Sequence, residues 1–182
     1  MRIQDDHQSE GGSWFDTGPL DGSFDGKIVV LGVGNPYMRD DGVGIQVVHD
    51  LPSRGVGEEI VVQESRALEA SLVWQFRHAA ALVIVDALVS GALAGTISRF
   101  SVTPRAGPVE GIPSLHELQL HDLVDLSGLD MVSFPLIIVA IEPKDCSLGE
   151  GLTEELRAAV PRAVDEVVKV LQELSSRKAK ES

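Results

Sequence analysis

Two carboxylates and one imidazole are the side chains of this 182-residue chain whose types and positions best suit chemistry on a metal ion. Asp40 and Asp41, of which one is available, stand before a glycine-rich helix start, Asp86 follows an apolar run, and His116 follows a loop rich in proline and glycine. Carboxylate and imidazole together suit a borderline divalent ion such as Ni²⁺ or Zn²⁺, and a carboxylate can also act as a general base. The spacing of the three residues does not by itself bring them together, so the elements that carry them have to be considered.

Each of these residues also has a structural interpretation. One of the adjacent pair Asp40 and Asp41 is explained as a helix N-cap, which accepts a backbone N–H. Asp86 is equally well explained as a turn residue, and His116 as a surface residue at a helix start. The combination of the three at strand ends is what favours a site.

The chain alternates between short aliphatic runs, typical of buried strands, and apolar residues at helical spacing. The run Gly95–Val102 follows Asp86 too closely for a parallel crossover of about a dozen residues, so we expect it to be antiparallel. This order implies a three-layer α/β domain with a mixed sheet, whose carboxyl edge collects the candidate residues. We predict strands at Ile28–Gly32, Ile60–Val62, Ala81–Val85, Gly95–Val102 and Pro135–Ile141, and helices at Val43–Leu51, Leu68–His78, Leu115–Leu126 and Leu152–Leu174.

A glycine-rich segment follows the first predicted strand. Gly32 and Gly34 could begin a dinucleotide fingerprint, but Tyr37 stands where that fingerprint needs its third glycine. We therefore expect these glycines to allow a tight turn and a close backbone approach.

Three residues after the last predicted strand could also belong to a site. Glu142 and Asp145 follow the last strand, where they could shape a substrate channel or hold a turn. Cys146 has no activating base near it in the sequence, so we expect a structural or exposed thiol rather than a nucleophile.

The composition excludes several classes of function. With 15 basic and 28 acidic residues the net charge is −13, which argues against nucleic acid or an anionic membrane as partner. Apolar runs are far shorter than the roughly 20 residues of a membrane span. A single cysteine fits a reducing compartment, so we expect a cytoplasmic protein. We also expect a monomer.

Composition also sets the expected domain boundaries. Residues 1–26 contain six acidic side chains, one arginine and several glycines, and we expect a disordered acidic leader. Residues 27–174 are predicted to form one α/β domain, and residues 175–182 a frayed tail.

Four motifs follow one another along the chain: Gly32-Val33-Gly34-Asn35, Asp40-Asp41-Gly42-Val43-Gly44, Val85-Asp86-Ala87 and Ser114-Leu115-His116-Glu117-Leu118. In this order they resemble the hydrogenase maturation protease family, endopeptidases that process the large subunit of nickel–iron hydrogenases. The resemblance covers about Lys27–Leu174 and implies a twisted, mixed five-stranded sheet between helices, phosphorylase/hydrolase-like, with one antiparallel strand. It implies that Asp41, Asp86 and His116 contact metal and that Asp41 and Asp86 serve catalysis. The loop residues Gly32, Gly34, Asn35, Asp40, Gly42 and Gly44 are expected to bind the substrate.

The resemblance implies removal of a C-terminal extension from the precursor large subunit after nickel insertion. Nickel would then belong to the substrate, and Zn²⁺ or Cd²⁺ could replace it in the isolated protein. Two departures leave the partner hydrogenase open: Asp41 stands where glutamate is frequent, and Glu64-Ser65-Arg66-Ala67 stands where many members have Gly-Gly-Thr. The alternatives are a metallohydrolase with its own zinc and a non-enzymatic nickel- or precursor-binding maturation factor.

Overall fold

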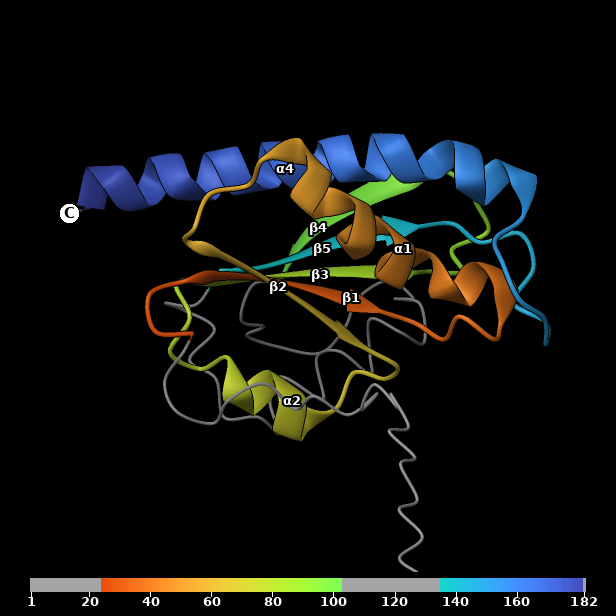
Figure 1. Cartoon of the computed structure of the whole chain (residues 1–182), viewed down its shortest axis with the longest axis horizontal. Coiled ribbons are helices and arrows are strands. Elements are labelled where there is room, and N and C mark those ends of the chain that lie inside the picture. Colours follow the sequence, from red (N-terminus) through yellow and green to blue (C-terminus); the bar gives the residue numbers. More distant parts are fainter. Residues whose placement is uncertain (1–23, 103–134, 182) are drawn as a thin grey trace, which may run out of the picture.

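A five-stranded mixed sheet forms the middle layer of the computed structural model, which describes residues 24–102 and 135–181. The strand order is β2-β1-β3-β5-β4 (Figure 1). The first four strands in this order are parallel, whereas β4 pairs antiparallel with β5, as predicted for Gly95–Val102. The strands are β1 (Ile28–Val33), β2 (Ile60–Ser65), β3 (Ala81–Ala87), β4 (Ile97–Val102) and β5 (Leu136–Ile141).

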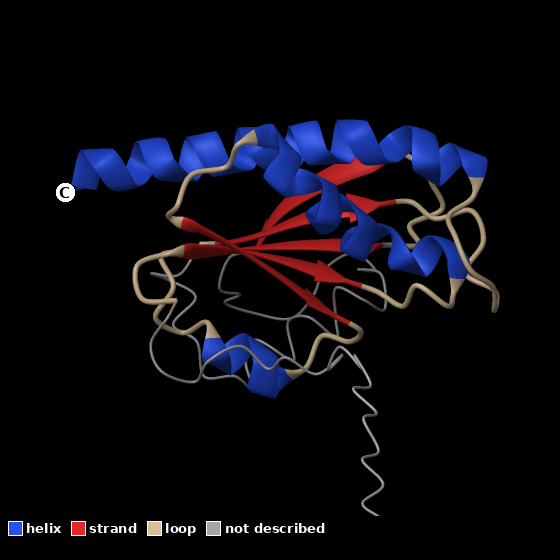
Figure 2. Cartoon of the chain, in the orientation of Figure 1, coloured by secondary structure: helices blue, strands red, loops and turns tan. Residues whose placement is uncertain are grey.

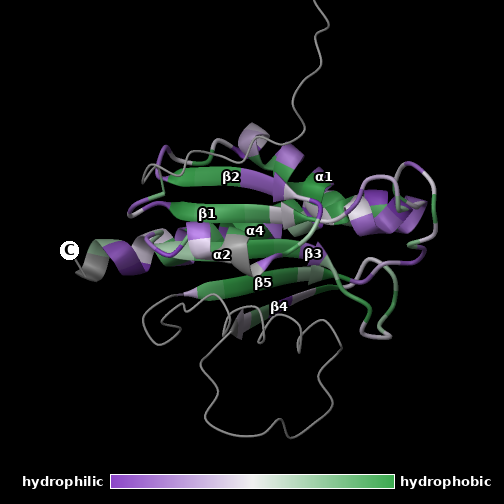
Figure 3. Cartoon of the chain, turned by 90° about the horizontal axis from the view of Figure 1, so that it is seen from below, coloured by the Kyte–Doolittle hydropathy of each residue, from purple (hydrophilic) through white to green (hydrophobic). Residues whose placement is uncertain are grey.

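Helices cover both faces of the sheet, which confirms the α/β class and its three layers. Helices α1 (Val43–Asp50) and α4 (Glu154–Glu181) lie on one face and α2 (Ala70–Gln75) on the other (Figure 2). The aliphatic residues of β1 alternate between the two sides, as the pleat requires. Ile28 and Val30 pack in the cluster with α1 and α4, while Val29 and Leu31 pack in the cluster with Phe76. Figure 3 shows the central strands as mostly hydrophobic, as expected for a sheet buried on both faces.

The folded domain begins before Lys27, the predicted boundary. Phe24 is buried and meets Phe76 edge-on, with ring centroids 5.0 Å apart. The Gly26 N–H donates to the His78 carbonyl at 3.0 Å. Phe24, within the predicted leader, therefore belongs to the core, and residues 1–23 lie outside the described part.

Two helices differ in length from their predictions. Helix α2 is shorter than Leu68–His78, because the chain turns after Gln75 to enter β3. Helix α4 continues beyond the predicted end at Leu174 to Glu181. Those last residues are polar and lack apolar periodicity, but a helix already nucleated extends at little cost. No helix in the described part combines the length and apolarity needed to cross a membrane.

The predicted helix Leu115–Leu126, with His116, lies outside the described residues. The structure therefore places the sheet, the first helix and the closing helix around the candidate site, and it does not describe the third predicted contact.

Candidate active site

The carboxyl ends of β1, β3 and β5 meet at one edge of the sheet because the three strands are parallel. Asp86 lies within β3, which continues to Ala87, rather than just after the strand as predicted. Asp41 lies on a short 3₁₀ turn, Arg39–Gly42, between β1 and α1. Both carboxylates are partly buried at this edge.

The glycine segment brings α1 against the sheet. A Cβ on Gly44 would stand 2.2 Å from the Val85 carbonyl oxygen and 2.3 Å from that of Val33. A Cβ on Gly34, whose φ is +142°, would stand 1.8 Å from the Asp41 carbonyl oxygen. Only glycine allows these approaches, which confirms the predicted close packing and sets Asp41 beside the end of β3.

The Asp41 side chain is fixed by the loop that precedes it. Its Oδ2 accepts the backbone N–H of Asn35 at 2.8 Å. Neither the 3₁₀ turn nor α1 has a side-chain cap, so the N-cap interpretation of the aspartate pair is wrong. The other carboxylate oxygen of Asp41 accepts no hydrogen bond from the described residues, so it is available for another partner.

Asp40 has a structural role that the sequence did not reveal. Its side chain is fully buried and accepts the backbone N–H groups of Lys144, Asp145 and Thr153, at 2.9, 3.0 and 2.7 Å. The Thr153 hydroxyl donates to it at 2.9 Å. Asp40 therefore ties the turn to the connection between β5 and α4. We expected it to bind substrate, but a carboxylate buried in this way is not available for that contact, and the buried Gly32, Gly34 and Gly44 serve packing instead.

Asp86 is the described carboxyl whose chemistry is most altered by the fold. Burial, with a smaller contribution from the nearby negative charge of Asp41, raises its pKa from 3.8 to about 7, although the Ala87 N–H, 2.8 Å from Oδ1, opposes the shift. When two carboxyl groups lie close together and are partly shielded from water, ionisation of one disfavours ionisation of the other. A pKa near neutrality is what a general base needs at physiological pH.

Among the described residues, no group of three or more His, Cys, Asp and Glu side chains is arranged to hold a metal ion. The structure brings Asp41 and Asp86 together, while the predicted third contact, His116, is outside the described ranges. The assignment of Asp41, Asp86 and His116 as metal contacts therefore stays a prediction.

The other candidates at this edge are structural. The Glu142 carboxylate is buried and accepts the Ser90 N–H and hydroxyl at 2.8 and 2.6 Å and the Gly91 N–H at 3.0 Å, so it holds a turn. Burial alone would raise the pKa of Glu142, but these hydrogen bonds leave it below its ordinary value. Burial raises the pKa of the Cys146 thiol, as do the charges of Asp41 and Asp40, so the thiol is a poor nucleophile.

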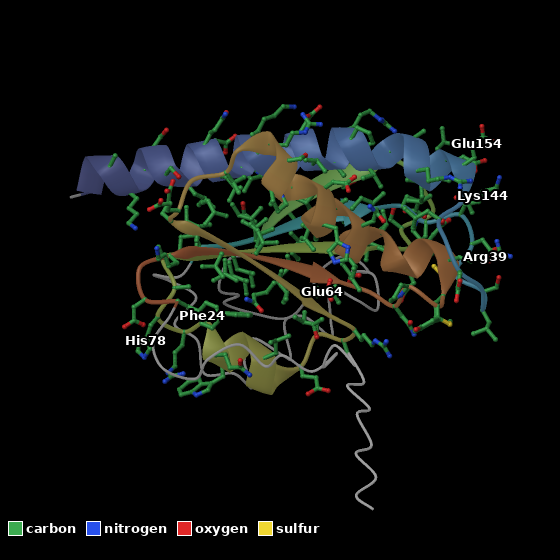
Figure 4. The ribbon with its side chains drawn as sticks, in the orientation of Figure 1. Phe24, Arg39, Glu64, His78, Lys144 and Glu154 are labelled. Atoms are coloured by element: carbon green, nitrogen blue, oxygen red, sulfur yellow. The ribbon has the colours of Figure 1, made fainter. Side chains whose placement is uncertain are left out.

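A groove lies next to Asp41, and the sequence did not predict it. It encloses about 730 Å³ between the loop after β1, helix α1 and the end of β2. The guanidinium of Arg66 lies over the Tyr37 ring, 5.4 Å from its centroid, and His49 pairs with Glu64 (Figure 4 labels Glu64). The departure from Gly-Gly-Thr marked this stretch, but only the fold turns it into a wall of the groove. The residues that line it include Tyr37, Gly42, Glu64, Ser65 and Arg66.

Comparisons with known proteins agree with this geometry. The chain is 29% identical over 152 residues to the Hydrogenase 2 maturation protease of Escherichia coli, covering 81% of this chain and 92% of that protein. The solved structure of the hydrogenase maturating endopeptidase HybD from E. coli matches with a TM-score of 0.64 at 25% identity, over 81% of this chain and 93% of that one. HybD from Thermococcus kodakarensis, a NiFe hydrogenase maturation protease, matches with a TM-score of 0.59 at 26% identity, over 80% and 99%.

The family model described as hydrogenase maturation protease matches residues 45–170, which is more than half of the chain. This match includes the end of β3 with Asp86 and most of the closing helix. The chain therefore belongs to the family of hydrogenase maturation proteases, enzymes that hydrolyse peptide bonds.

Proposed function

We propose that this protease removes the C-terminal extension from the nickel-loaded precursor of a nickel–iron hydrogenase large subunit. The observation that supports this most directly is the meeting of Asp41 and Asp86 at the carboxyl edge of the sheet, with the pKa of Asp86 raised to about 7. Both residues come from motifs that the family resemblance assigned to metal contact and catalysis. The reaction is proposed to take place in the cytoplasm.

In this proposal the nickel arrives with the substrate. Asp41, Asp86 and His116 contact an ion that the precursor already holds. Without the ion, two carboxylates face each other, and burial makes their joint ionisation unfavourable. The loaded precursor brings the missing positive charge, so the pair discriminates loaded from empty precursor.

The chemistry is hydrolysis of one peptide bond. Asp86 accepts a proton from a water molecule, whose oxygen attacks the carbonyl carbon of the scissile bond. The C–N bond then breaks, and the proton passes to the leaving nitrogen. The nickel polarises the carbonyl as a Lewis acid. A carboxylate has several lone pairs, so Asp86 can contact the ion and still accept a proton.

The groove beside Asp41 suits the C-terminal extension of the precursor, bound in an extended conformation. It begins at Gly42, next to Asp41, and runs between α1 and the end of β2. The loop and the strand that line the groove offer backbone and side-chain groups to a bound peptide, including the side chains of Tyr37 and Arg66.

The test is incubation of purified protein with precursor, with mass spectrometry before and after. We expect the parent to release the C-terminal peptide from nickel-loaded precursor and not from precursor made without nickel. Asp86→Asn should reduce the rate at least about a hundredfold, as loss of a general base does. Asp165→Asn, an exposed aspartate paired with Arg54, is the matched control and should cleave normally.

Any one of three results would contradict the proposal. Cleavage of empty precursor at the parent rate would refute the nickel contact. Binding of precursor with no change in its mass would favour a non-enzymatic maturation factor, and a stoichiometric zinc ion in the purified protein would favour a resident metal.

A further inference from the structure

Four exposed apolar side chains stand on loops at the edge that carries Asp41 and Asp86. The exposed fractions are 85% for Leu93, 82% for Leu148, 62% for Val89 and 48% for Tyr37. Among the described residues, the only other large apolar side chain this exposed is Trp74, on α2. Single exposed apolar residues are ordinary, so the observation that matters is their gathering at one edge.

These four residues lie on three connections that follow parallel strands. Tyr37 follows β1, Val89 and Leu93 lie between β3 and β4, and Leu148 lies between β5 and α4. Tyr37 and Leu148 are linked through the backbone, because the Gly149 N–H donates to the Tyr37 carbonyl at 2.9 Å. Figures 1 and 3 place the three connections at the same end of the molecule, and Figure 3 colours the one after β3 largely hydrophobic.

The two buried charged side chains of the described part both fix these connections. Glu142 accepts three hydrogen bonds from Ser90 and Gly91, between Val89 and Leu93. Asp40 accepts four from the connection that carries Leu148. Burying a carboxylate is costly, and here each one orders a loop that displays apolar side chains. An interface ordered in advance loses less entropy on binding.

The two basic side chains on these connections, Arg39 and Lys144, are already paired within the chain. Arg39 lies 3.3 Å from Asp145, and Lys144 lies 2.5 Å from Glu155 (Figure 4 labels Arg39 and Lys144 at this end). The connection between β3 and β4, which carries Val89 and Leu93, contains no charged residue. Such a surface binds by burying apolar area, as the centres of protein interfaces do.

From these contacts we infer that Tyr37, Val89, Leu93 and Leu148, the apolar rim, dock the folded body of the precursor large subunit. The rim adjoins the candidate active site, so a partner seated on it has its C-terminal region at Asp41 and Asp86. The inference rests on the proposed function and adds to it a second contact, remote from the scissile bond. That contact supplies affinity, while the carboxylates supply chemistry.

The experiment compares the double variant Leu93→Ser/Leu148→Ser with Trp74→Ser, which removes an equally apolar surface residue from the other face. Both side chains of the double variant are over four-fifths exposed, so its thermal unfolding should match that of the parent. With nickel-loaded precursor we expect KM to rise about tenfold or more with kcat unchanged. Trp74→Ser should keep the parent KM.

The outcomes separate this inference from the proposed function. A double variant with the parent KM, or an equal loss in Trp74→Ser, overturns the rim alone while cleavage by the parent stands. A parent that dimerises in sedimentation, with a monomeric double variant, makes the rim an interface between copies and also overturns it. A parent that neither binds nor cleaves immobilised precursor overturns the proposed function and the rim with it.

Discussion

The carboxylate of Asp40 accepts two hydrogen bonds from Thr153, one from the backbone N–H at 2.7 Å and one from the hydroxyl at 2.9 Å. The two residues are 113 positions apart in the chain. This link closes the first motif onto the start of α4 and holds the neighbouring Asp41 at the site.

Asp40→Asn should destabilise the fold by about 2–4 kcal/mol, because the amide nitrogen cannot accept and leaves buried N–H groups unpaired. Urea unfolding measures the change. Asp50→Asn, at an exposed aspartate, should change stability by less than about 0.5 kcal/mol. Equal stability of the Asp40 variant and the parent would show that the buried network is dispensable.

Asp86→Asn should make the protein more stable at alkaline pH while removing activity. Because burial raises the pKa of Asp86 to about 7, the folded state binds more protons than the unfolded state between its ordinary pKa of 3.8 and that value. The contribution is fully present below the lower value and is lost as pH rises through the higher one. The asparagine variant cannot ionise, so we expect a gain of about 1–2 kcal/mol at about pH 8.

Unfolding midpoints at about pH 5 and about pH 8 measure this difference. The gap between parent and variant should widen toward the higher pH. Parallel pH profiles for the two proteins would mean that Asp86 is ionised in the fold at neutral pH.

Gly44→Ala should cost about 2 kcal/mol or more, or displace α1, since the new Cβ would overlap the carbonyl oxygens of Val85 and Val33. Activity should fall with it because Asp41 precedes this helix. In Gly57→Ala the new Cβ meets only the movable end of the Glu59 side chain, so this control should stay within about 0.5 kcal/mol. Normal stability and cleavage in the Gly44 variant would contradict the packing role.

Cys146→Ser should retain kcat within about twofold, because the thiol has a raised pKa and acts as neither nucleophile nor base. The same raised pKa predicts slow alkylation by iodoacetamide at neutral pH. Loss of cleavage in this variant, with unchanged unfolding, would point to a thiol-dependent mechanism.

The order of strands and helices could be read from the sequence because their periodic patterns are local. The short gap after Asp86 was enough to predict the antiparallel β4, since a parallel return needs a longer crossover. Boundaries were less accurate: α4 outlasts its apolar pattern, and Phe24 joins the core although its neighbours are polar and glycine-rich. These boundaries depend on contacts with residues far along the chain, which a local sequence pattern does not reveal.

Residue type and position at strand ends selected Asp86 and one of the pair Asp40 and Asp41, and the family resemblance pointed to Asp41. Only the tertiary structure showed why the two neighbouring aspartates have different roles. On a 3₁₀ turn successive side chains point about 120° apart, so one carboxylate enters the core while the other faces the site. The raised pKa of Asp86, the groove beside Gly42 and the held loops of the apolar rim likewise depend on burial and on distant contacts, which no local pattern encodes.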